Sequence, residues 1–207
     1  MTHPSPQKLP LAHTSNPRDP RNPAHMLEAV TRQWGGQSDL WIFGYASLIW
    51  RPEFDFAEER FATLYGYHRA LKMWSRINRG TPECPGLVFG LLHGGSCKGV
   101  VFRIPQQQVK ALLPALWERE MPNGVYDPKW LQCHTAQGSV RALAFTLSKR
   151  SPNHTGVLHA DVYRQIFSNA KGRYGTTRAY AQLTYDKLRE LGIDDRALGK
   201  LLKLVGP

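Results

Sequence analysis

The 207-residue chain has few cysteines and lacks any long apolar run, and both absences narrow the class of protein. Its three cysteines, Cys84, Cys97 and Cys133, are odd in number and far apart, so they fit neither a disulfide framework nor a zinc motif. A membrane-spanning helix needs about 18 consecutive apolar residues, and the chain contains no such run. Residues 1–25 also lack the apolar core of a secretory signal. We therefore expect a cytoplasmic protein with free thiols and no membrane segment.

Several short motifs of cofactor-dependent enzymes are also missing. The chain contains neither G-x-G-x-x-G nor a P-loop, which argues against a nucleotide cofactor. Its eight histidines do not occur in H-E-x-x-H or another metal-binding spacing. Ser47 has small neighbours but is not part of the G-x-S-x-G of a serine hydrolase, which favours positioning over nucleophilic attack. The sequence thus predicts no metal and no cofactor.

Acidic residues are scarce relative to basic ones. The chain has 16 Asp and Glu against 27 Lys and Arg, a net charge of +11. Residues 140–207 alone hold twelve basic and five acidic residues. Such a charge could attract a nucleic acid or a small anionic substrate, or could simply keep the protein soluble. Because the chain has no extended run of Lys or Arg, we expect no nucleic-acid partner.

Hydrophobic residues make up 42% of the chain, which is enough for the core of one domain at this length. Residues 1–25 are rich in Pro, His and Asn and are predicted to form a loose arm. The apolar spacing from Pro23 to Trp34 predicts a short helix that Gly35 ends. Residues 1–36 are thus expected to be a partly disordered N-terminal extension with a short helix, and residues 37–207 a single domain.

From residue 40 onward, a block of predicted strands with one helix inside it precedes a helical C-terminal part. Strands are predicted from Leu40, over Phe61–Trp74, Leu87–Leu92 and Lys98–Ile104, and within Trp130–Ser148. Helices are predicted after Pro105 and over Ala160–Ala170, Thr176–Leu191 and Asp195–Leu204. The strands on either side of His93–Ser96 are expected to form a hairpin closed there. We predict an α+β fold, a small, partly closed mixed β-barrel flanked by helices.

The stretch Trp41–Trp50 is the first candidate for function. It begins as a buried strand of large apolar residues and is interrupted by the small residues Gly44 and Ser47. The pattern is compatible with a core strand followed by a turn. The same residues also fit a loop whose backbone N–H groups hold an anion or a carbonyl oxygen, although the pattern alone favours the core strand and turn.

Glu120 is the second candidate, because it falls on the apolar face of the helix predicted after Pro105. That face is formed by Val109, Leu112, Leu113, Leu116 and Trp117. At about 100° per residue, Glu120 lies about 20° from Val109 around the helix axis, whereas Glu118 lies about 180° away. Burial would raise the pKa of Glu120 and let it act as a base near neutral pH. Alternatively, Glu120 turns to water or pairs with Arg119.

Taken together, several motifs resemble the ChaC family of γ-glutamylcyclotransferases, in particular its bacterial branch. Gly44–Leu48 is similar to the family's G-Y-G-S-L loop, and Arg119-Glu120 followed by Gly124-Val125-Tyr126 resembles its R-E…G-x-Y segment. Further similar segments are Arg79-Gly80 with Pro85-Gly86, Val100–Pro105, Asn153 with Gly156, and Arg173–Tyr180. The similar segments occur in the family's order over residues 40–190.

The resemblance implies an enzyme that cleaves the γ-glutamyl bond of glutathione, giving 5-oxoproline and cysteinylglycine without a metal or cofactor. In such enzymes the substrate's own α-amine attacks its γ-carbonyl, and by the match Glu120 is the general acid/base. The substrate-binding residues that the match implies are Tyr45, Ala46, Ser47, Leu48, Tyr126 and Arg79. The backbone N–H groups of the 45–48 loop would hold the glutamyl moiety or the oxyanion. Tyr126 would be a phenol donor, and Arg79 would meet a substrate carboxylate, in a protein expected to be monomeric.

One position departs from the family, which usually has Gly where this chain has Ala46. If the position requires a positive φ or a very close approach of the substrate, the methyl group would strain the backbone or narrow the pocket. Two other functions stay open at this point. One is a cyclotransferase for other γ-glutamyl amino acids or amines. The other is a non-catalytic protein, such as the regulator of cation transport that the family's historical name implies.

Overall fold

The computed structural model describes residues 19–206, so most of the arm predicted for residues 1–25 lies outside the described part. The strands are β1 (Leu40–Gly44), β2 (Glu58–Ser75), β3 (Gly86–Ile104), β4 (Asp127–Thr135), β5 (Gly138–Thr146), β6 (Lys171–Gly172) and β7 (Gly175–Thr176). The helices are α1 (Pro23–Trp34), α2 (Ser47–Trp50), α3 (Gln106–Glu120), α4 (Ala160–Asn169), α5 (Thr177–Glu190) and α6 (Arg196–Val205). The predicted helices are confirmed as α1 and α3 to α6, and the strand predicted over Phe61–Trp74 is confirmed within β2.

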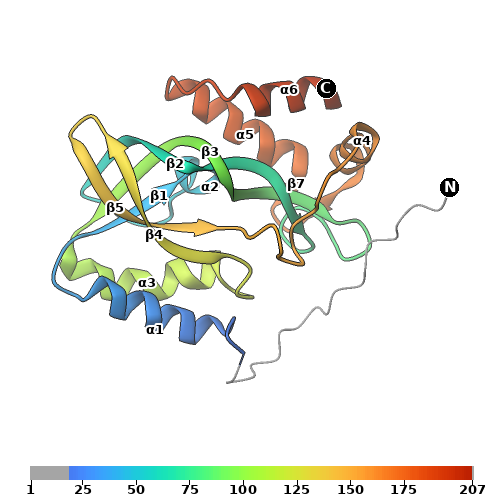
Figure 1. Ribbon diagram of the computed structural model, residues 1–207. Helices are drawn as coiled ribbons and strands as arrows, with labels where there is room; N and C mark the ends of the chain where they lie inside the picture. The colour runs from blue at the N-terminus through green and yellow to red at the C-terminus, as the bar shows by residue number, and fades with distance from the viewer. Residues whose placement is uncertain (1–18, 207) are drawn as a thin grey trace.

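Five strands form a closed barrel in the order β1-β3-β2-β4-β5 (Figure 1). Neighbours in this order pair antiparallel. β5 then returns beside β1 in parallel, with Trp41 opposite Ala142 and Ile42 opposite Leu143. The predicted α+β mixed barrel is confirmed, and it is closed rather than partly closed because β5 bonds to β1.

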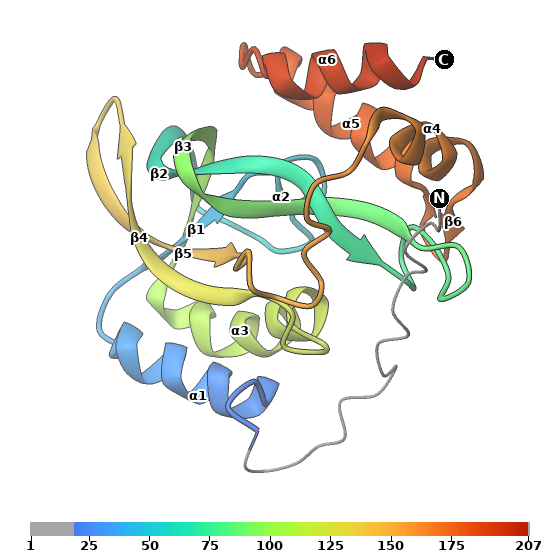
Figure 2. The ribbon, with the colours of Figure 1, turned by 45° about the vertical axis from the view of Figure 1, so that its right-hand side comes forward.

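Helices cover the barrel on two sides (Figures 1 and 2). α1 and α3 lie together on one side, and α4, α5 and α6 lie on the other. The Trp117 indole of α3 donates to the Pro23 carbonyl of α1 at 2.7 Å, which joins the first two helices. On the opposite side, the Phe89 ring of β3 lies 5.4 Å from the Tyr180 ring of α5, measured between centroids. The apolar core is therefore shared between the barrel and two helical layers.

The hairpin predicted at His93–Ser96 is wrong. One continuous strand, β3, runs through this segment and pairs with β2 along its length, so the reversal lies in the loop between β2 and β3. Gly94 and Gly95 both have positive φ and lie opposite Gly66, where the pairing register shifts. The Gly-Gly pair forms a β-bulge in β3. Glycine adopts positive φ readily in bulges and in turns alike, so the sequence alone did not distinguish the two.

The residues just before α1 are held in place, in contrast to the loose arm predicted for residues 1–25. Arg21 donates from Nε to the Gly124 carbonyl at 2.9 Å and from Nη2 to the Tyr126 carbonyl at 3.0 Å. Its Nη1 forms an ion pair with Asp127 at 2.8 Å. Arg21 is thus anchored by contacts that composition does not reveal, and residues 23–25 belong to the helix predicted from Pro23.

The amphipathic pattern of α3 is confirmed. Its buried residues are Val109, Leu113, Leu116 and Trp117. Leu112 is only partly buried, and Glu118 is exposed, as its position opposite Val109 requires. The buried face ends at Glu120, which brings this carboxylate to the barrel.

Candidate active site

The connection from β1 to α2 is held by close backbone packing. β1 ends at Gly44 and α2 begins at Ser47, so Tyr45 and Ala46 form the turn between them. A Cβ atom placed on Gly99 of β3 would lie 2.3 Å from the Gly44 carbonyl oxygen. Two atoms cannot approach so closely, so position 99 requires glycine. The interruption in the apolar stretch therefore lies where β1 passes closest to β3.

Ala46 has a φ of −144°, so it does not occupy the left-handed region that favours glycine. The positive φ that would strain an alanine is therefore absent at this position. Its side chain is buried and contributes to the wall of a cavity. What the methyl group changes is therefore the shape of that cavity.

This cavity has a volume of about 20 Å³. Its walls come from parts of the chain that are far apart in sequence: the 45–48 loop, strands β3 and β5, the end of α3 with the segment after it, and α5. The lining residues are Tyr45, Ala46, Ser47, Leu48, Phe89, Glu120, Tyr126, Phe145 and Tyr180. The fold thus brings six of the seven predicted site residues together, and the exception is Arg79.

Arg79 lies against Tyr180 and is not among the residues that line the cavity. Its guanidinium carbon is 4.9 Å from the centroid of the Tyr180 ring, and its Nη1 donates to the Tyr174 carbonyl. Burial lowers the pKa of Arg79 from its usual value. The structure therefore connects Arg79 to the cavity through the Tyr180 ring, and its contact with a substrate carboxylate stays a prediction.

Glu120 is the acidic residue of the cavity, and its side chain is 14% exposed. Burial raises the pKa of this carboxyl, and the negative charge of Glu53 acts in the same direction. The Arg119 guanidinium opposes this shift, with its Nε 3.0 Å from Oε1 of Glu120. Both interpretations of the sequence are met in part, because Glu120 is buried on the apolar face and is also paired with Arg119.

Three phenols surround the carboxylate. Tyr45 donates to the Phe145 carbonyl at 2.9 Å, and Tyr126 donates to the Phe89 carbonyl at 3.1 Å. The Tyr180 hydroxyl instead accepts from the Phe89 N–H at 3.4 Å and is also hydrogen-bonded to the Ser47 side chain, so it joins β3 to the 45–48 segment. Burial raises the pKa of all three phenols, and the neighbouring carboxylate adds to the effect, so they remain protonated at neutral pH.

Tyr180, Phe89 and Phe145 also line the cavity, and none of them is among the site residues predicted from the sequence. Tyr180 ends a segment that resembles the family, but its helical spacing is that of a buried residue of α5. Phe89 and Phe145 follow the apolar pattern of their strands and carry no local signal. The resemblance over Arg173–Tyr180 was the one available indication, and it did not separate Tyr180 from its neighbours.

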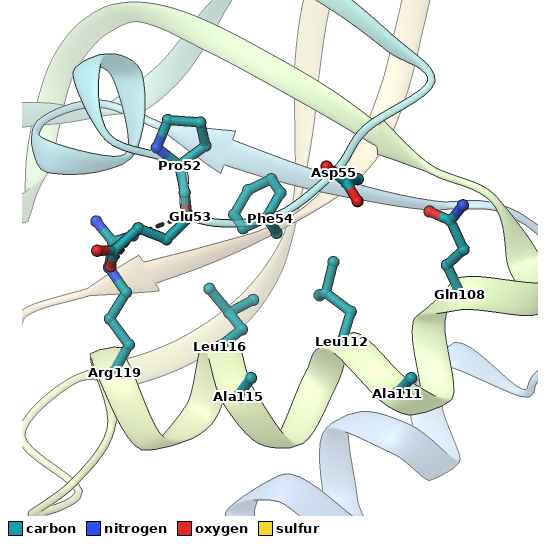
Figure 3. Close-up of a pocket in the computed structure, with 10 residues that line it drawn as sticks. All are labelled: Pro52, Glu53, Phe54, Asp55, Gln108, Ala111, Leu112, Ala115, Leu116 and Arg119. Atoms are coloured by element: carbon teal, nitrogen blue, oxygen red, sulfur yellow. Dashed lines mark hydrogen bonds and ion pairs between the residues drawn. The ribbon is translucent and has the colours of Figure 1, made fainter.

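A larger depression of about 600 Å³ lies between α3 and the 52–55 segment (Figure 3). Arg119, at one end of it, donates to the Pro52 carbonyl at 2.7 Å and pairs with Glu53 at 3.0 Å. Because the same guanidinium contacts Glu120, Arg119 separates this depression from the small cavity. Between Gln108 and Arg119, the α3 wall of the depression consists of alanine and leucine residues, and its carboxylates, Glu53 and Asp55, lie on the opposite segment. We therefore assign the chemistry to the smaller cavity, where the carboxylate and the phenols converge.

The cavity has the groups needed for proton transfer coupled to stabilisation of a negative oxygen. A carboxyl with a raised pKa can exchange a proton with a substrate near neutral pH. Backbone N–H groups and protonated phenols can stabilise a developing oxyanion. Within residues 19–206, no group of three or more His, Cys, Asp or Glu side chains is arranged to hold a metal ion.

The family model of ChaC-like proteins matches residues 40–207. The chain belongs to the ChaC family. A ChaC-family relative from Escherichia coli K12, named glutathione-specific gamma-glutamylcyclotransferase, is 36% identical over 167 residues, which cover 80% of this chain and 72% of the relative. Human glutathione-specific gamma-glutamylcyclotransferase 1 is 29% identical over 182 residues, which cover 84% of this chain and 82% of the human protein.

A solved structure shows the same fold. It is the crystal structure of a yeast γ-glutamylcyclotransferase specific to glutathione, which matches with a TM-score of 0.74 and 19% sequence identity. The match covers 82% of this chain and 96% of the yeast chain. The predicted mixed barrel flanked by helices is thereby confirmed as a γ-glutamylcyclotransferase-like fold.

Proposed function

We propose that this ChaC-family chain is a glutathione-directed γ-glutamylcyclotransferase, which converts glutathione to 5-oxoproline and cysteinylglycine. The observation that carries the proposal is a buried carboxylate with a raised pKa, Glu120, that shares one cavity with the 45–48 loop. The names of the E. coli and human relatives support glutathione as the substrate.

The reaction needs one group that both accepts and donates a proton. Glu120 accepts a proton from the α-amine of the glutamyl group, and the freed amine attacks the γ-carbonyl carbon. A new C–N bond closes the five-membered ring, while the original γ-glutamyl C–N bond breaks. Glu120 passes this proton to the leaving nitrogen. It then transfers the second excess proton of the new ring nitrogen to the same amine, which leaves as an ammonium group, and no water is consumed. Because nucleophile and carbonyl belong to one molecule, holding the substrate folded supplies much of the acceleration.

The negative charge that develops on the γ-carbonyl oxygen requires donors. The backbone N–H groups of the 45–48 loop are suited to this role because they border the same cavity as Glu120. Among the phenols, Tyr126 directs its proton to the Phe89 carbonyl and is therefore less suited to this role. A volume of about 20 Å³ holds about one water molecule, so side chains around the cavity must move when the glutamyl group binds.

A comparison of two substrates tests the proposal. We expect the purified protein to release 5-oxoproline from glutathione with a kcat/KM about tenfold or more above that for γ-glutamyl-alanine, a usual size for substrate discrimination. Chromatography of 5-oxoproline measures both rates. Equal or faster release from γ-glutamyl-alanine would favour the wider cyclotransferase activity. Release from neither would favour a non-catalytic role.

The pH dependence of the reaction tests the link between Arg119 and Glu120. Glu120 must be deprotonated to accept the amine proton, so activity rises with pH through its pKa. Arg119 lowers this pKa against the effect of burial. Arg119→Gln will therefore raise the pKa of Glu120 and move the acid limb of the kcat/KM profile to higher pH.

Arg51→Gln is the matched control for this profile. Arg51 also pairs with Glu53, so its replacement removes an equal charge and frees the same partner without removing the contact at Glu120. The acid limb of Arg51→Gln should stay close to that of the unsubstituted protein. An unmoved limb in Arg119→Gln, or one at lower pH, would contradict the assignment of that limb to Glu120.

We also propose that the protein works in the cytoplasm as a single chain. Cys84, Cys97 and Cys133 are all unbridged, which suits a reducing compartment. The cavity is built from residues of one chain, so one copy supplies all of its walls. Over residues 19–206, every helix is too short or too polar to cross a membrane.

A further inference from the structure

Arg69 of β2 is a buried cation behind the 45–48 loop, outside the lining of the cavity. Its Nη1 donates to the Tyr45 carbonyl at 2.6 Å and to the Lys98 carbonyl at 3.2 Å. Its Nε and Nη2 donate to one carboxylate oxygen of Asp195, at 2.9 and 2.7 Å. The Arg69 side chain is 4% exposed and that of Asp195 is 14% exposed. A single guanidinium thus joins the loop to the C-terminal part of the chain.

Asp195 is itself held in place by α6. Its second carboxylate oxygen accepts from the Leu198 N–H at 2.9 Å and caps the N-terminus of the helix. Each oxygen of this carboxylate therefore has a different role, one on the helix and one on Arg69. The position of the guanidinium is consequently set by an element that contributes no residue to the cavity.

Stability alone is a weak reason for this buried ion pair. The desolvation free energy of two buried charges is about as large as their Coulombic attraction. Replacing such a pair with apolar residues of similar volume often leaves a protein equally stable. What distinguishes the pair is the group that it holds, the carbonyl of the first residue of the predicted substrate loop. A guanidinium can bind a carbonyl and a carboxylate at once because its donors form a rigid fork.

Because the peptide bond is planar, the hydrogen bond to the Tyr45 carbonyl also fixes the direction of the next N–H group, that of Ala46. In a trans peptide, the carbonyl of one residue and the N–H of the next point in opposite directions. The Tyr45 carbonyl accepts from Arg69, so the N–H of Ala46 points away from Arg69. Ala46 lines the cavity, whereas Arg69 does not. We infer that Arg69 and Asp195 are positioning residues, which orient the Tyr45–Ala46 peptide so that the Ala46 N–H faces the γ-carbonyl oxygen.

Arg69→Lys tests this role, which rests on the proposed function for its kinetic measurement. Lysine keeps the charge but lacks the fork, so it cannot hold Asp195 and the Tyr45 carbonyl together. We expect kcat for 5-oxoproline release to fall about tenfold to a hundredfold, somewhat less than for complete loss of one oxyanion donor. KM should change much less, because the donor acts on charge that develops in the transition state.

Arg103→Lys is the matched control. The Arg103 guanidinium also forms ion pairs, with Asp39 at 2.6 Å and with Glu58 at 2.9 Å. These contacts do not involve the 45–48 loop. This variant should keep the kcat of the unsubstituted protein per folded molecule. A merely structural role of Arg69 would lower the melting temperature without separating kcat from KM, and that result would overturn the inference.

Amide hydrogen exchange of Ala46, followed by NMR, provides a measurement that does not depend on turnover. Exchange should be faster in Arg69→Lys than in Arg103→Lys, because the peptide is released. Unchanged exchange would overturn the inference, even if kcat falls. If the unsubstituted protein releases no 5-oxoproline, the proposed function fails, and exchange alone decides whether Arg69 positions the loop.

Asp195→Asn carries the test if Arg69→Lys does not fold. In the aspartate, one oxygen accepts from the Leu198 N–H and the other from Arg69. In asparagine an NH2 group replaces one of these oxygens, so one of the two donors loses its acceptor. Arg69 can still donate to the Tyr45 carbonyl, but Asp195 no longer holds the guanidinium in place. We therefore expect kcat to fall and Ala46 exchange to accelerate, each by less than in Arg69→Lys. Activity and exchange equal to those of the unsubstituted protein would overturn the inference.

Discussion

Replacing Glu120 with Gln will lower the kcat for 5-oxoproline release from glutathione by about 10²–10⁴, the usual contribution of a general acid/base. The amide has nearly the same size as the carboxylate but can neither accept the amine proton nor return one to the leaving nitrogen. Because the carboxylate lies inside the cavity with the loop and the phenols, no exposed group replaces it directly. Steady-state release of 5-oxoproline at equal concentrations of folded protein measures the effect.

The same substitution should not reduce stability at neutral pH. Burial raises the pKa of Glu120 in the folded state above its unfolded value, so the folded protein binds more protons between the two pKa values. The stability contributed by this group is therefore present below its unfolded pKa and lost as the pH rises through its folded pKa. Glutamine avoids that loss, and thermal unfolding at pH 7 should show a melting temperature equal to or above that of the unsubstituted protein.

Glu118→Gln is the matched control, since it removes the same charge from the same helix at an exposed position. Its kcat should equal that of the unsubstituted protein. A fully active Glu120→Gln protein would reject Glu120 as the base. Equal losses in both variants would point to the helix or its charge rather than to the buried carboxylate.

Gly99→Ala will lower the free energy of unfolding by about 3 kcal/mol, the upper part of the usual range for overpacking. The new Cβ atom would lie 2.3 Å from the Gly44 carbonyl oxygen and 3.0 Å from the Phe43 ring. β1 and β3 are neighbours in the barrel, so the backbone cannot move apart without stretching the ladder between them. Urea unfolding of the variant and the unsubstituted protein measures the difference.

Gly99→Ala should also impair turnover, because Gly44 immediately precedes the 45–48 loop. A shift of the strand end displaces the loop's N–H groups from Glu120, and a displacement of about 1 Å can cost about a hundredfold in rate. Gly199→Ala is the control: its nearest neighbour is the Tyr185 hydroxyl at 3.2 Å, the tip of a flexible side chain. In α6 this change should be neutral or stabilising by up to about 1 kcal/mol. Unchanged stability of Gly99→Ala would contradict the close approach of β1 and β3.

Local sequence signals predicted the regular elements well. Helical periodicity placed Glu120 on the buried face of α3 and Glu118 on the exposed face, as the structure has them. The same signals failed at Gly94-Gly95, because a glycine pair permits both a turn and a bulge. The choice between them depends on the partner strand, since β2 continues beside the whole of β3.

By itself, the sequence determined most of the longer helices and strands, the face of α3 that carries Glu120, and, through the ChaC resemblance, the expected chemistry. Only the tertiary structure decided what lies opposite each of these groups. It closed the barrel, placed Tyr180 rather than Arg79 at the cavity, and put Arg69 behind Tyr45. The physical reason is that a periodic pattern reports which face of an element is apolar but not which distant segment meets that face. The Tyr45 hydroxyl, for example, bonds to a carbonyl one hundred residues further along the chain, and no local spacing encodes that contact.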